Sequence, residues 1–479
     1  MIKINRCVLA LCLFSLMNTA ATAQDNRYAI VACKQTKIKP EWQKVISTLK
    51  EKYPNAVEII WNEKVEESLA ELKSLHPRYT CFVAQPEEAN RAFVASVHQL
   101  TRSYDEDPYC DTLWGILTGY DAENARRIAQ ERSPLIIHQV SSGTEIALSM
   151  CEEGVWYDEL VMHKTVRKTK GDIITGRGPG DTTLALANTL TDGDSQLFVT
   201  SGHATERQWQ IGFRYKNGFF QSKAGQMLGA PTTGDPFRIH STTPKVYMAV
   251  GNCLMGNING PDSMALAWMN DVGMRQMLGY TVLTWYGYGG WGVLDYFVEQ
   301  PGRYSLTEAF HANHHALIHR INRYFPSLDG IPLEAGSRSL PNVEPTTMGV
   351  KDGLTAFDSR GLLWDRDVVA FYGDPGWEAR MSEQPRAYEQ TLRHEQNLYT
   401  FQVRPLRGTE SFEPINTNGS QRGGRPIIEF LPNRLKNVEI LSGHDLNPVV
   451  TDDFILIPTQ QMKRSDKVFT VSFQAELAD

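Results

Sequence analysis

Two residues whose types could do chemistry together, His203 and Cys253, each follow a short apolar run. Residues 197–199 are apolar and lead into Thr200-Ser201-Gly202-His203, and residues 246–250 lead into Gly251-Asn252-Cys253. Short apolar runs bounded by small turn residues predict buried strands of a parallel sheet. Because chemistry in such sheets collects beyond the carboxyl ends of the strands, the pattern predicts a thiol nucleophile beside an imidazole acid/base.

Each of these residues also has a structural interpretation, Cys253 as a packed core thiol and His203 as a structural histidine. Cys33 is a rival nucleophile, because it ends the strand-like run of residues 28–33. No glycine trails it closely, and Lys34 and Gln35 follow it directly. We therefore favour Cys253 as the nucleophile.

The first 23 residues have a basic start, an apolar centre and the small-residue ending Ala21-Thr22-Ala23. This pattern predicts a secretory signal peptide cleaved after Ala23, and hence a secreted or periplasmic protein. No other run approaches the roughly 18 apolar residues of a membrane helix, so we expect no membrane span. Without the two basic residues of this leader the formal charge falls from −7 to −9. We therefore expect no binding to nucleic acid.

Five cysteines remain after that cleavage, and an odd number leaves at least one thiol free or intermolecular in an oxidising compartment. Cys33 and Cys81 lie inside strand-like runs, where a buried thiol is usual. The sequence leaves open which of Cys33, Cys81, Cys110 and Cys151 form disulfides.

The elements that must position His203 and Cys253 follow an α/β order. Between residues 24 and 140, strand and helix patterns alternate, which predicts a parallel sheet covered on both faces. Residues 141–380 form a second α/β part that contains both candidate residues. From residue 385 to 479, short spaced strands without helices predict a small β-sandwich of immunoglobulin type. The expected fold is thus two α/β halves followed by a β-sandwich.

An apolar strand is expected over residues 280–285, followed by the glycine-rich aromatic loop Tyr286-Gly287-Tyr288-Gly289-Gly290-Trp291. Such a loop at a strand end is equally consistent with a pocket wall and with a packed surface loop. A helix over residues 305–324 is predicted by the capping box formed by Ser305 and Glu308.

Metal binding is disfavoured at the two places where the sequence suggests it. His311, His315 and His319 share one flank of the predicted helix, but one helix rarely supplies three converging ligands. We expect polar or interfacial histidines there. The acidic run of residues 105–111 lacks the spacing and glycine of an EF-hand, which favours a solvated turn. We expect no cofactor for the reaction, and a structural calcium ion is left open.

The chain resembles the gingipain-type cysteine peptidases of the caspase-like clan. A strand ending in Gly-His, about fifty residues and then a strand ending in Cys with a nearby Gly is the layout of that clan. The upstream DTLWGILTGYDAENARRIA, the aromatic LTWYGYGG, the closing YGDPGW and the trailing strands complete the resemblance, which spans most of residues 28–377. It implies that residues 141–380 are a caspase-like catalytic subdomain.

Residue by residue, the resemblance implies that Cys253 is the nucleophile and His203 the acid/base. Backbone N–H groups near Gly202, His203 and Ala204, and at Cys253, would form the oxyanion hole. The chain departs from the family pattern at Ala204, where glycine is usual. It also departs at Asn252, where a small apolar residue is usual. A third, orienting carboxylate is implied, with Glu152, Glu153 and Asp158 as open alternatives.

The activity implied is hydrolysis of peptide bonds in a protein or peptide substrate through an acyl-enzyme. Trp285, Tyr286 and Tyr288 would form a wall of the primary pocket. A basic side chain there would need a buried carboxylate, for which Asp158 and Glu152 are candidates. The alternative functions are an exported binding or adhesion protein on an inactive peptidase scaffold, and a structural surface-layer component. The oligomeric state is left open.

Overall fold

The computed structural model describes residues 28–332, 334–337 and 339–478. The predicted signal peptide lies outside these described residues. None of the helices in the described ranges combines the length and the apolarity that a membrane span requires.

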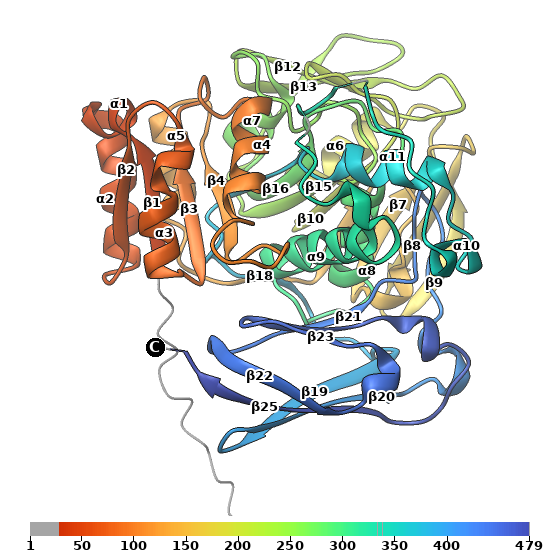
Figure 1. Ribbon diagram of the computed structural model, residues 1–479. Helices are drawn as coiled ribbons and strands as arrows, with labels where there is room; N and C mark the ends of the chain where they lie inside the picture. The colour runs from red at the N-terminus through yellow and green to blue at the C-terminus, as the bar shows by residue number, and fades with distance from the viewer. Residues whose placement is uncertain (1–27, 333, 338, 479) are drawn as a thin grey trace, which may run out of the picture.

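A mixed, mostly parallel sheet of twelve strands forms the centre of the larger part of the molecule (Figure 1). In spatial order its strands are β2 (Val57–Trp61), β1 (Tyr28–Cys33), β3 (Tyr79–Val83), β4 (Leu113–Leu117), β17 (Val369–Gly373), β16 (Met274–Tyr280), β15 (Lys245–Ala249), β10 (Leu197–Thr200), β6 (Gln139–Ser142), β7 (Glu153–Tyr157), β8 (Lys164–Thr169) and β9 (Asp172–Arg177). Every residue of β1, β4, β10, β15 and β17 is buried. Both faces of these strands are therefore covered, as their apolar sequences predict.

Ten of the twelve strands form two parallel blocks that run in opposite directions, and β8 and β9 extend the sheet beyond β7 as antiparallel strands. The strands from β2 to β17 are parallel to one another, and so are the strands from β16 to β7. The blocks meet where β16 pairs antiparallel with β17. The expected division at residue 140 falls inside β6, and both predicted α/β parts contribute to this one sheet. Carboxyl ends of strands in the two blocks consequently point to opposite edges.

Helices pack on this sheet, and their apolar faces complete the core. They are α1 (Lys34–Ile38), α2 (Pro40–Lys52), α3 (Leu69–Leu75), α4 (Arg91–Leu100), α5 (Ala122–Ala129), α6 (Thr183–Thr191), α7 (Met264–Asp271), α8 (Tyr288–Phe297), α9 (Leu306–Tyr324), α10 (Thr347–Lys351) and α11 (Ala356–Asp365). The predicted capping box of α9 is confirmed, with the Ser305 hydroxyl accepting from the Glu308 N–H and the Glu308 carboxylate accepting from the Ser305 N–H.

Two smaller sheets flank the central one. β11 (Gln208–Gln210), β12 (Phe219–Lys223), β13 (Gln226–Ala230) and β14 (Phe237–Ile239) form an antiparallel sheet within the segment between His203 and Cys253. β5 (Leu135–Ile137) pairs in parallel with β18 (Ala379–Met381).

The C-terminal residues form two antiparallel sheets, drawn in blue in Figure 1. One contains β19 (Tyr388–Glu395), β20 (Leu398–Pro405), β25 (Phe469–Leu477) and β22 (Leu435–Ser442), and the other β21 (Ile427–Phe430), β24 (Phe454–Ile457) and β23 (Val449–Val450). Ile455 and Ile457 face the buried cluster that the two sheets share. Phe454 and Leu456, on the opposite face of β24, belong to the core of the larger part. Because successive side chains of a strand point to opposite faces, β24 packs into both cores and so joins the C-terminal sheets to the larger part.

Candidate functional site

Five neighbouring strands, β16, β15, β10, β6 and β7, run in the same direction, so their carboxyl ends meet at one edge of the sheet. The segments that leave this edge carry, in the same order, Thr284, Cys253, His203, Thr144 and Glu159. β10 and β15 pair directly, with Thr200 opposite Ala249, and the Val250 N–H donates to the Thr200 carbonyl at 3.0 Å. The sheet therefore delivers the two predicted residues to adjacent positions.

The turn that carries Cys253 is sharp. Leu254, directly after the cysteine, has a left-handed backbone with φ of 60°, which is unusual for a residue other than glycine. The Cys253 side chain is partly exposed. The Thr284 N–H donates to its sulfur at 3.3 Å, and the thiol approaches the Thr284 carbonyl at 3.9 Å. Both contacts come from the backbone of Thr284, so this residue fixes the position of the sulfur at the edge of the sheet.

The loop that carries His203 also departs from regular backbone. Gly202 has φ of 89°, and a side chain there would meet the Glu159 carboxylate at 3.2 Å. His203 itself is exposed, and its ring stacks on Phe213 with 4.6 Å between ring centroids. Among the described residues, no hydrogen bond joins the His203 ring to the Cys253 sulfur, whose contacts are with Thr284.

Asn252 ties the two loops together. Its side chain is fully buried, accepts a hydrogen bond from the Thr200 hydroxyl at 2.5 Å and donates to the Gly202 carbonyl at 3.1 Å. Its own carbonyl accepts from the Thr284 hydroxyl at 3.1 Å. The residue that departs from the family pattern therefore links all three segments that surround the candidate nucleophile.

The backbone N–H groups expected to stabilise an oxyanion lie at these same loops. Ala204 faces Trp209 in an isolated antiparallel bridge whose hydrogen bonds are made by the flanking residues His203 and Thr205. Within the described part of the chain, the N–H groups of Ala204 and Cys253 donate to no protein acceptor. Both residues are partly exposed.

Glu159 is a buried carboxylate at this edge that the sequence analysis did not single out. Its oxygens accept from the Ser201 hydroxyl at 2.6 and 2.5 Å and from the Thr144 hydroxyl at 2.7 Å. Burial raises the pKa of Glu159, and the two hydroxyl donors oppose that shift. The signal that could have revealed it is its position two residues after β7, a strand of the same block.

The predicted third carboxylates lie elsewhere or are already paired. Glu152 is half exposed and pairs with His138 at 2.7 Å, and Glu153 accepts from the Gln139 amide at 2.7 Å. Asp158 pairs with Lys164 at 2.9 Å and accepts two backbone N–H groups of the following turn. Glu159 is the neighbouring residue that turns toward the histidine loop.

The strand that precedes the aromatic segment begins and ends earlier than predicted. The expected strand over residues 280–285 is wrong, because β16 spans Met274–Tyr280 and the following residues form a loop beside Cys253. Trp285 is 38% exposed in that loop. Tyr286 is buried against Gly361 and donates to Asp358, and Tyr288 is buried at the start of α8. Only Trp285 of the three predicted wall residues presents its ring to solvent.

Exposed apolar side chains flank the edge on both sides. They are Leu160, Val161, Met162 and Phe213 beside the histidine loop, and Leu283, Trp285 and Phe357 beside the cysteine loop. A cavity of about 1160 Å³ is lined by Asn257 and Gly260, which follow Cys253 closely, and by Arg91 of α4. These surfaces could accept an extended chain with apolar side chains.

The other four thiols are distant from this chemistry. Cys33, Cys81, Cys110 and Cys151 are buried and free, so no disulfide joins cysteines within the described residues. Burial raises the pKa of Cys33, and its strand belongs to the oppositely directed block. The rival nucleophile therefore lies at the other edge of the sheet from Cys253.

Two groups of potential metal ligands occur among the described residues, and neither lies at this edge. In the first, His98 and His314 approach Asp367, but Asp367 already pairs with Arg102 at 2.6 Å and Arg366 at 3.0 Å. The second contains Asp105, Asp107 and Asp452, and burial raises the pKa of Asp107 to about 7. The preference for a solvated turn over a calcium site at residues 105–111 stays a prediction.

The three histidines on the predicted flank of α9 are buried and belong to neither ligand group. His311 bonds the backbone of Trp114, and His319 bonds the Tyr109 hydroxyl at 3.1 Å. His315 stacks on Phe454 of β24 with 4.4 Å between ring centroids. His315 thus lies where the C-terminal sheets meet the larger part.

Comparison of the chain with protein-family models, with curated proteins and with solved structures yields no match.

Proposed function

We propose that this chain is a cysteine peptidase that hydrolyses peptide bonds through Cys253 and His203. The observation that carries the proposal is the direct parallel pairing of β10 and β15, which end in the histidine and cysteine loops at one sheet edge. The left-handed turn at Leu254 adds support, because strained backbone persists mainly at functional sites. The caspase-like fold, the gingipain-type family, the C-terminal β-sandwich and export of the protein belong to the same proposal.

In the proposed reaction the Cys253 thiolate attacks the scissile carbonyl carbon and forms a tetrahedral intermediate. The N–H groups of Ala204 and Cys253 stabilise the oxyanion, a contribution whose loss at one donor costs about 100-fold or more in rate. The C–N bond breaks as His203, in its imidazolium form, gives its proton to the leaving amine. His203 then takes a proton from water, whose attack on the thioester releases the acid and regenerates the Cys253 thiolate and the His203 imidazolium.

His203 must approach the sulfur for these proton transfers. The stacking of its exposed ring on Phe213 supports a role for Phe213 in holding the imidazole at the site entrance. A bound substrate would complete the arrangement, because catalytic hydrogen bonds often tighten only in the complex.

Glu159 is the carboxylate we propose to serve the site, in place of Glu152, Glu153 and Asp158. It lies 3.2 Å from where a side chain at Gly202 would begin and is fixed by two hydroxyl donors, so its carboxyl group faces the histidine loop. A buried carboxylate at this position supports a preference for a basic residue before the scissile bond. The exposed apolar side chains on both flanks support apolar residues at the neighbouring substrate positions.

The test is the reactivity of Cys253 in the folded mature chain. Iodoacetamide should modify Cys253 much faster than the buried Cys33 and Cys81, because a thiolate reacts and a packed thiol does not. The Cys253→Ala variant should lose hydrolysis of a mixed peptide library and keep the melting temperature. The Cys151→Ala variant is the matched control, because it removes a buried thiol and should retain hydrolysis.

The alternative is a binding or adhesion protein on an inactive scaffold, favoured by the exposed His203 ring that does not bond Cys253. In that case Cys253 would be modified no faster than expected from its exposure. The wild-type chain would bind peptides without cleaving them, and cleavage that depends on Cys253 would refute this alternative.

A further inference from the structure

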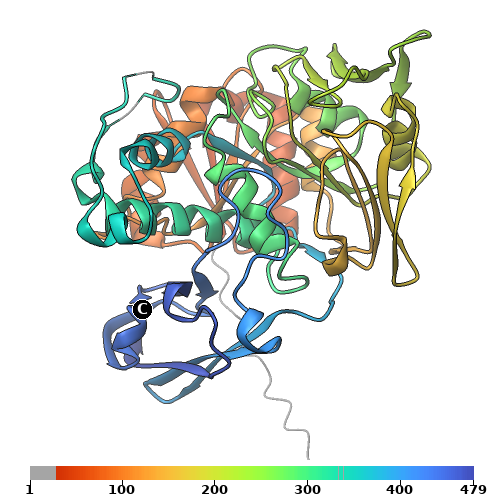
Figure 2. The ribbon, with the colours of Figure 1, turned by 90° about the vertical axis from the view of Figure 1, so that its right-hand side faces the viewer.

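A long loop of the C-terminal part leaves its own sheets and crosses the larger part of the molecule. It connects β20 with β21, and in Figure 2 it rises in blue from the small sheets and passes over the green helices. We call its residues 415–425 the arm. The backbone N–H groups of Ile415 and Asn416 donate to the Glu299 carboxylate at 3.1 and 3.2 Å. The arm therefore begins anchored at the end of α8.

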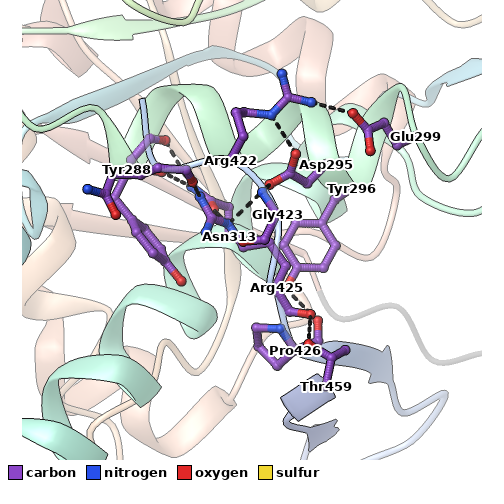
Figure 3. Close-up of polar contacts among 12 residues, drawn as sticks. Tyr288, Asp295, Tyr296, Glu299, Asn313, Arg422, Gly423, Arg425, Pro426 and Thr459 are labelled. Carbon is purple, nitrogen blue, oxygen red and sulfur yellow. Dashed lines mark hydrogen bonds and ion pairs between the residues drawn. The ribbon is translucent and has the colours of Figure 1, made fainter. Parts of the chain in front are cut away.

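The main anchor is a buried charge cluster (Figure 3). The Arg422 side chain is 2% exposed, donates to Asp295 at 2.6 Å and pairs with Glu299. The Gly423 N–H donates to the other Asp295 oxygen at 3.0 Å. Because buried charges persist only when paired and hydrogen-bonded, this cluster holds the arm at one position on α8.

A second anchor involves Arg425, whose guanidinium lies over the Tyr288 ring at 3.7 Å. Its Nε donates to Asn313 of α9 at 3.0 Å (Figure 3). A side chain at Gly292 would overlap both Arg425 and Asn313, so glycine is required for this contact. The arm is thus fitted to α8 and α9 in shape as well as in charge.

The tip of the arm reaches the loop of the candidate nucleophile through Trp291. Gly419 has φ of 97°, and a side chain there would overlap the Trp291 ring. Trp291 in turn packs closely against Gly251. A Cβ atom at Gly251 would lie 2.7 Å from the Trp291 indole nitrogen and 3.1 Å from the Ser201 Cβ. Gly251 and Ser201 each stand two residues before a candidate catalytic residue.

Asn418 connects the tip to the histidine loop by hydrogen bonds. Its amide donates to the Thr144 hydroxyl at 3.1 Å, and that hydroxyl donates to Glu159 at 2.7 Å. Glu159 also accepts from Ser201, which precedes Gly202-His203. One short segment of the C-terminal part therefore contacts the supports of both loops.

We propose that the arm is a positioning element of the candidate site, so that the Cys253 and His203 loops reach working geometry only when the C-terminal part is docked. This rests on the proposed function. It assigns the C-terminal sheets a role in the reaction, in contrast to an independent binding module. Asn418, Gly419 and Trp291 act through other residues and do not touch the substrate.

The experiment compares two glycine substitutions in the full mature chain. Gly419→Ala introduces a clash with Trp291, whereas Gly408→Ala, the matched control, places a methyl group at positive φ with no neighbour within 4 Å. The readouts are peptide hydrolysis and the rate constant for alkylation of Cys253. We expect Gly419→Ala to lower kcat about tenfold with KM little changed, because small misplacements of reacting groups have large effects on rate. It should also change the alkylation rate constant, and Gly408→Ala should match the wild type in both.

A second pair keeps the test decisive if Gly419→Ala does not fold. Asn418→Ala removes the amide that donates to Thr144, and Asn447→Ala removes an exposed asparagine of the same C-terminal part. Asn418→Ala should lower kcat, whereas Asn447→Ala should not. If both arm variants hydrolyse and alkylate like their controls, the positioning proposal is overturned while the peptidase proposal stands.

If the wild type itself hydrolyses no peptide, the peptidase proposal fails instead. In that case Cys253, which is partly exposed, should still react slowly with iodoacetamide. The rate constant of this alkylation then tests the positioning proposal without a hydrolysis assay. A rate constant changed by the arm variants and unchanged by the controls supports positioning of the loop. Equal rate constants refute it.

Discussion

Asn252 should be required for the site, because its buried side chain, directly before Cys253, bonds Gly202, which directly precedes His203. Replacing it with Ala removes the acceptor of the Thr200 hydroxyl and the donor to the Gly202 carbonyl. Thr200 keeps its bond to the Tyr247 hydroxyl at 2.7 Å, so it retains one partner. The Gly202 carbonyl loses its side-chain donor.

The expected loss of stability follows from these bonds. Each lost hydrogen bond is worth about 1 kcal/mol, and a buried acceptor left without its donor adds about 1 kcal/mol. We therefore expect Asn252→Ala to lower the free energy of unfolding by about 3 kcal/mol. Hydrolysis should fall further than unfolding explains, by roughly 100-fold in kcat, because Gly202 directly precedes His203.

Urea unfolding and peptide hydrolysis, both at a temperature where the variant is folded, measure the two effects. Asn188→Ala is the matched control, since Asn188 is an exposed asparagine of α6 and lies in neither loop. Asn252→Asp adds a sharper test, because the carboxylate retains the acceptor for Thr200 and loses the donor to Gly202. If Asn252→Ala is destabilised but retains wild-type kcat, the link between this bond and catalysis is wrong.

Three further substitutions probe stability, pH dependence and substrate binding. Arg422→Met should lower the free energy of unfolding by about 3–5 kcal/mol at pH 8. The loss should be smaller at pH 5.5, because burial already raises the pKa of Glu299 to about 7 and a protonated Glu299 needs no partner; equal losses at both pH values would contradict this. Burial lowers the pKa of His319 from 6.5 to about 4, so the folded state binds fewer protons and loses stability as pH falls through this window. In urea titrations at pH 7, 6 and 5, His319→Asn should reduce that dependence by about 0.7 kcal/mol between pH 7 and 6 and by about 1.2 kcal/mol between pH 6 and 5. An unchanged dependence would show that His319 titrates normally. Trp285→Ala should raise KM about tenfold, equivalent to about 1.4 kcal/mol, with kcat little changed. Leu398→Ala, at an exposed apolar position of the C-terminal part, should leave KM unaltered.

Local patterns predicted much of the secondary structure correctly. The apolar runs before His203 and Cys253 are buried strands, and the face of α2 with Trp42 and Val45 is buried as its periodicity predicts. The error at residues 280–285 has a physical reason. The apolar residues there pack beside Cys253 as a loop, and β16 begins at Met274 because its pairing with β15 and β17 fixes the register.

The sequence by itself determined which chemistry the candidate site could perform, because a strand end followed by small residues is a local signal for an exposed functional side chain. It also indicated Glu152, Glu153 and Asp158 as alternatives for a carboxylate that turns toward His203, and did not indicate Glu159. Only the tertiary structure decided that Glu159 does so, because its orientation depends on hydroxyl donors at Thr144 and Ser201, far away in the chain. The same holds for the arm, since a buried pairing between Arg422 and Asp295 joins residues that no periodicity relates. The burial pattern of a strand or helix depends on residues that are close in sequence, so the sequence alone predicts it. Contacts between distant segments form only after the sheet has brought those segments together, so the sequence alone does not predict them.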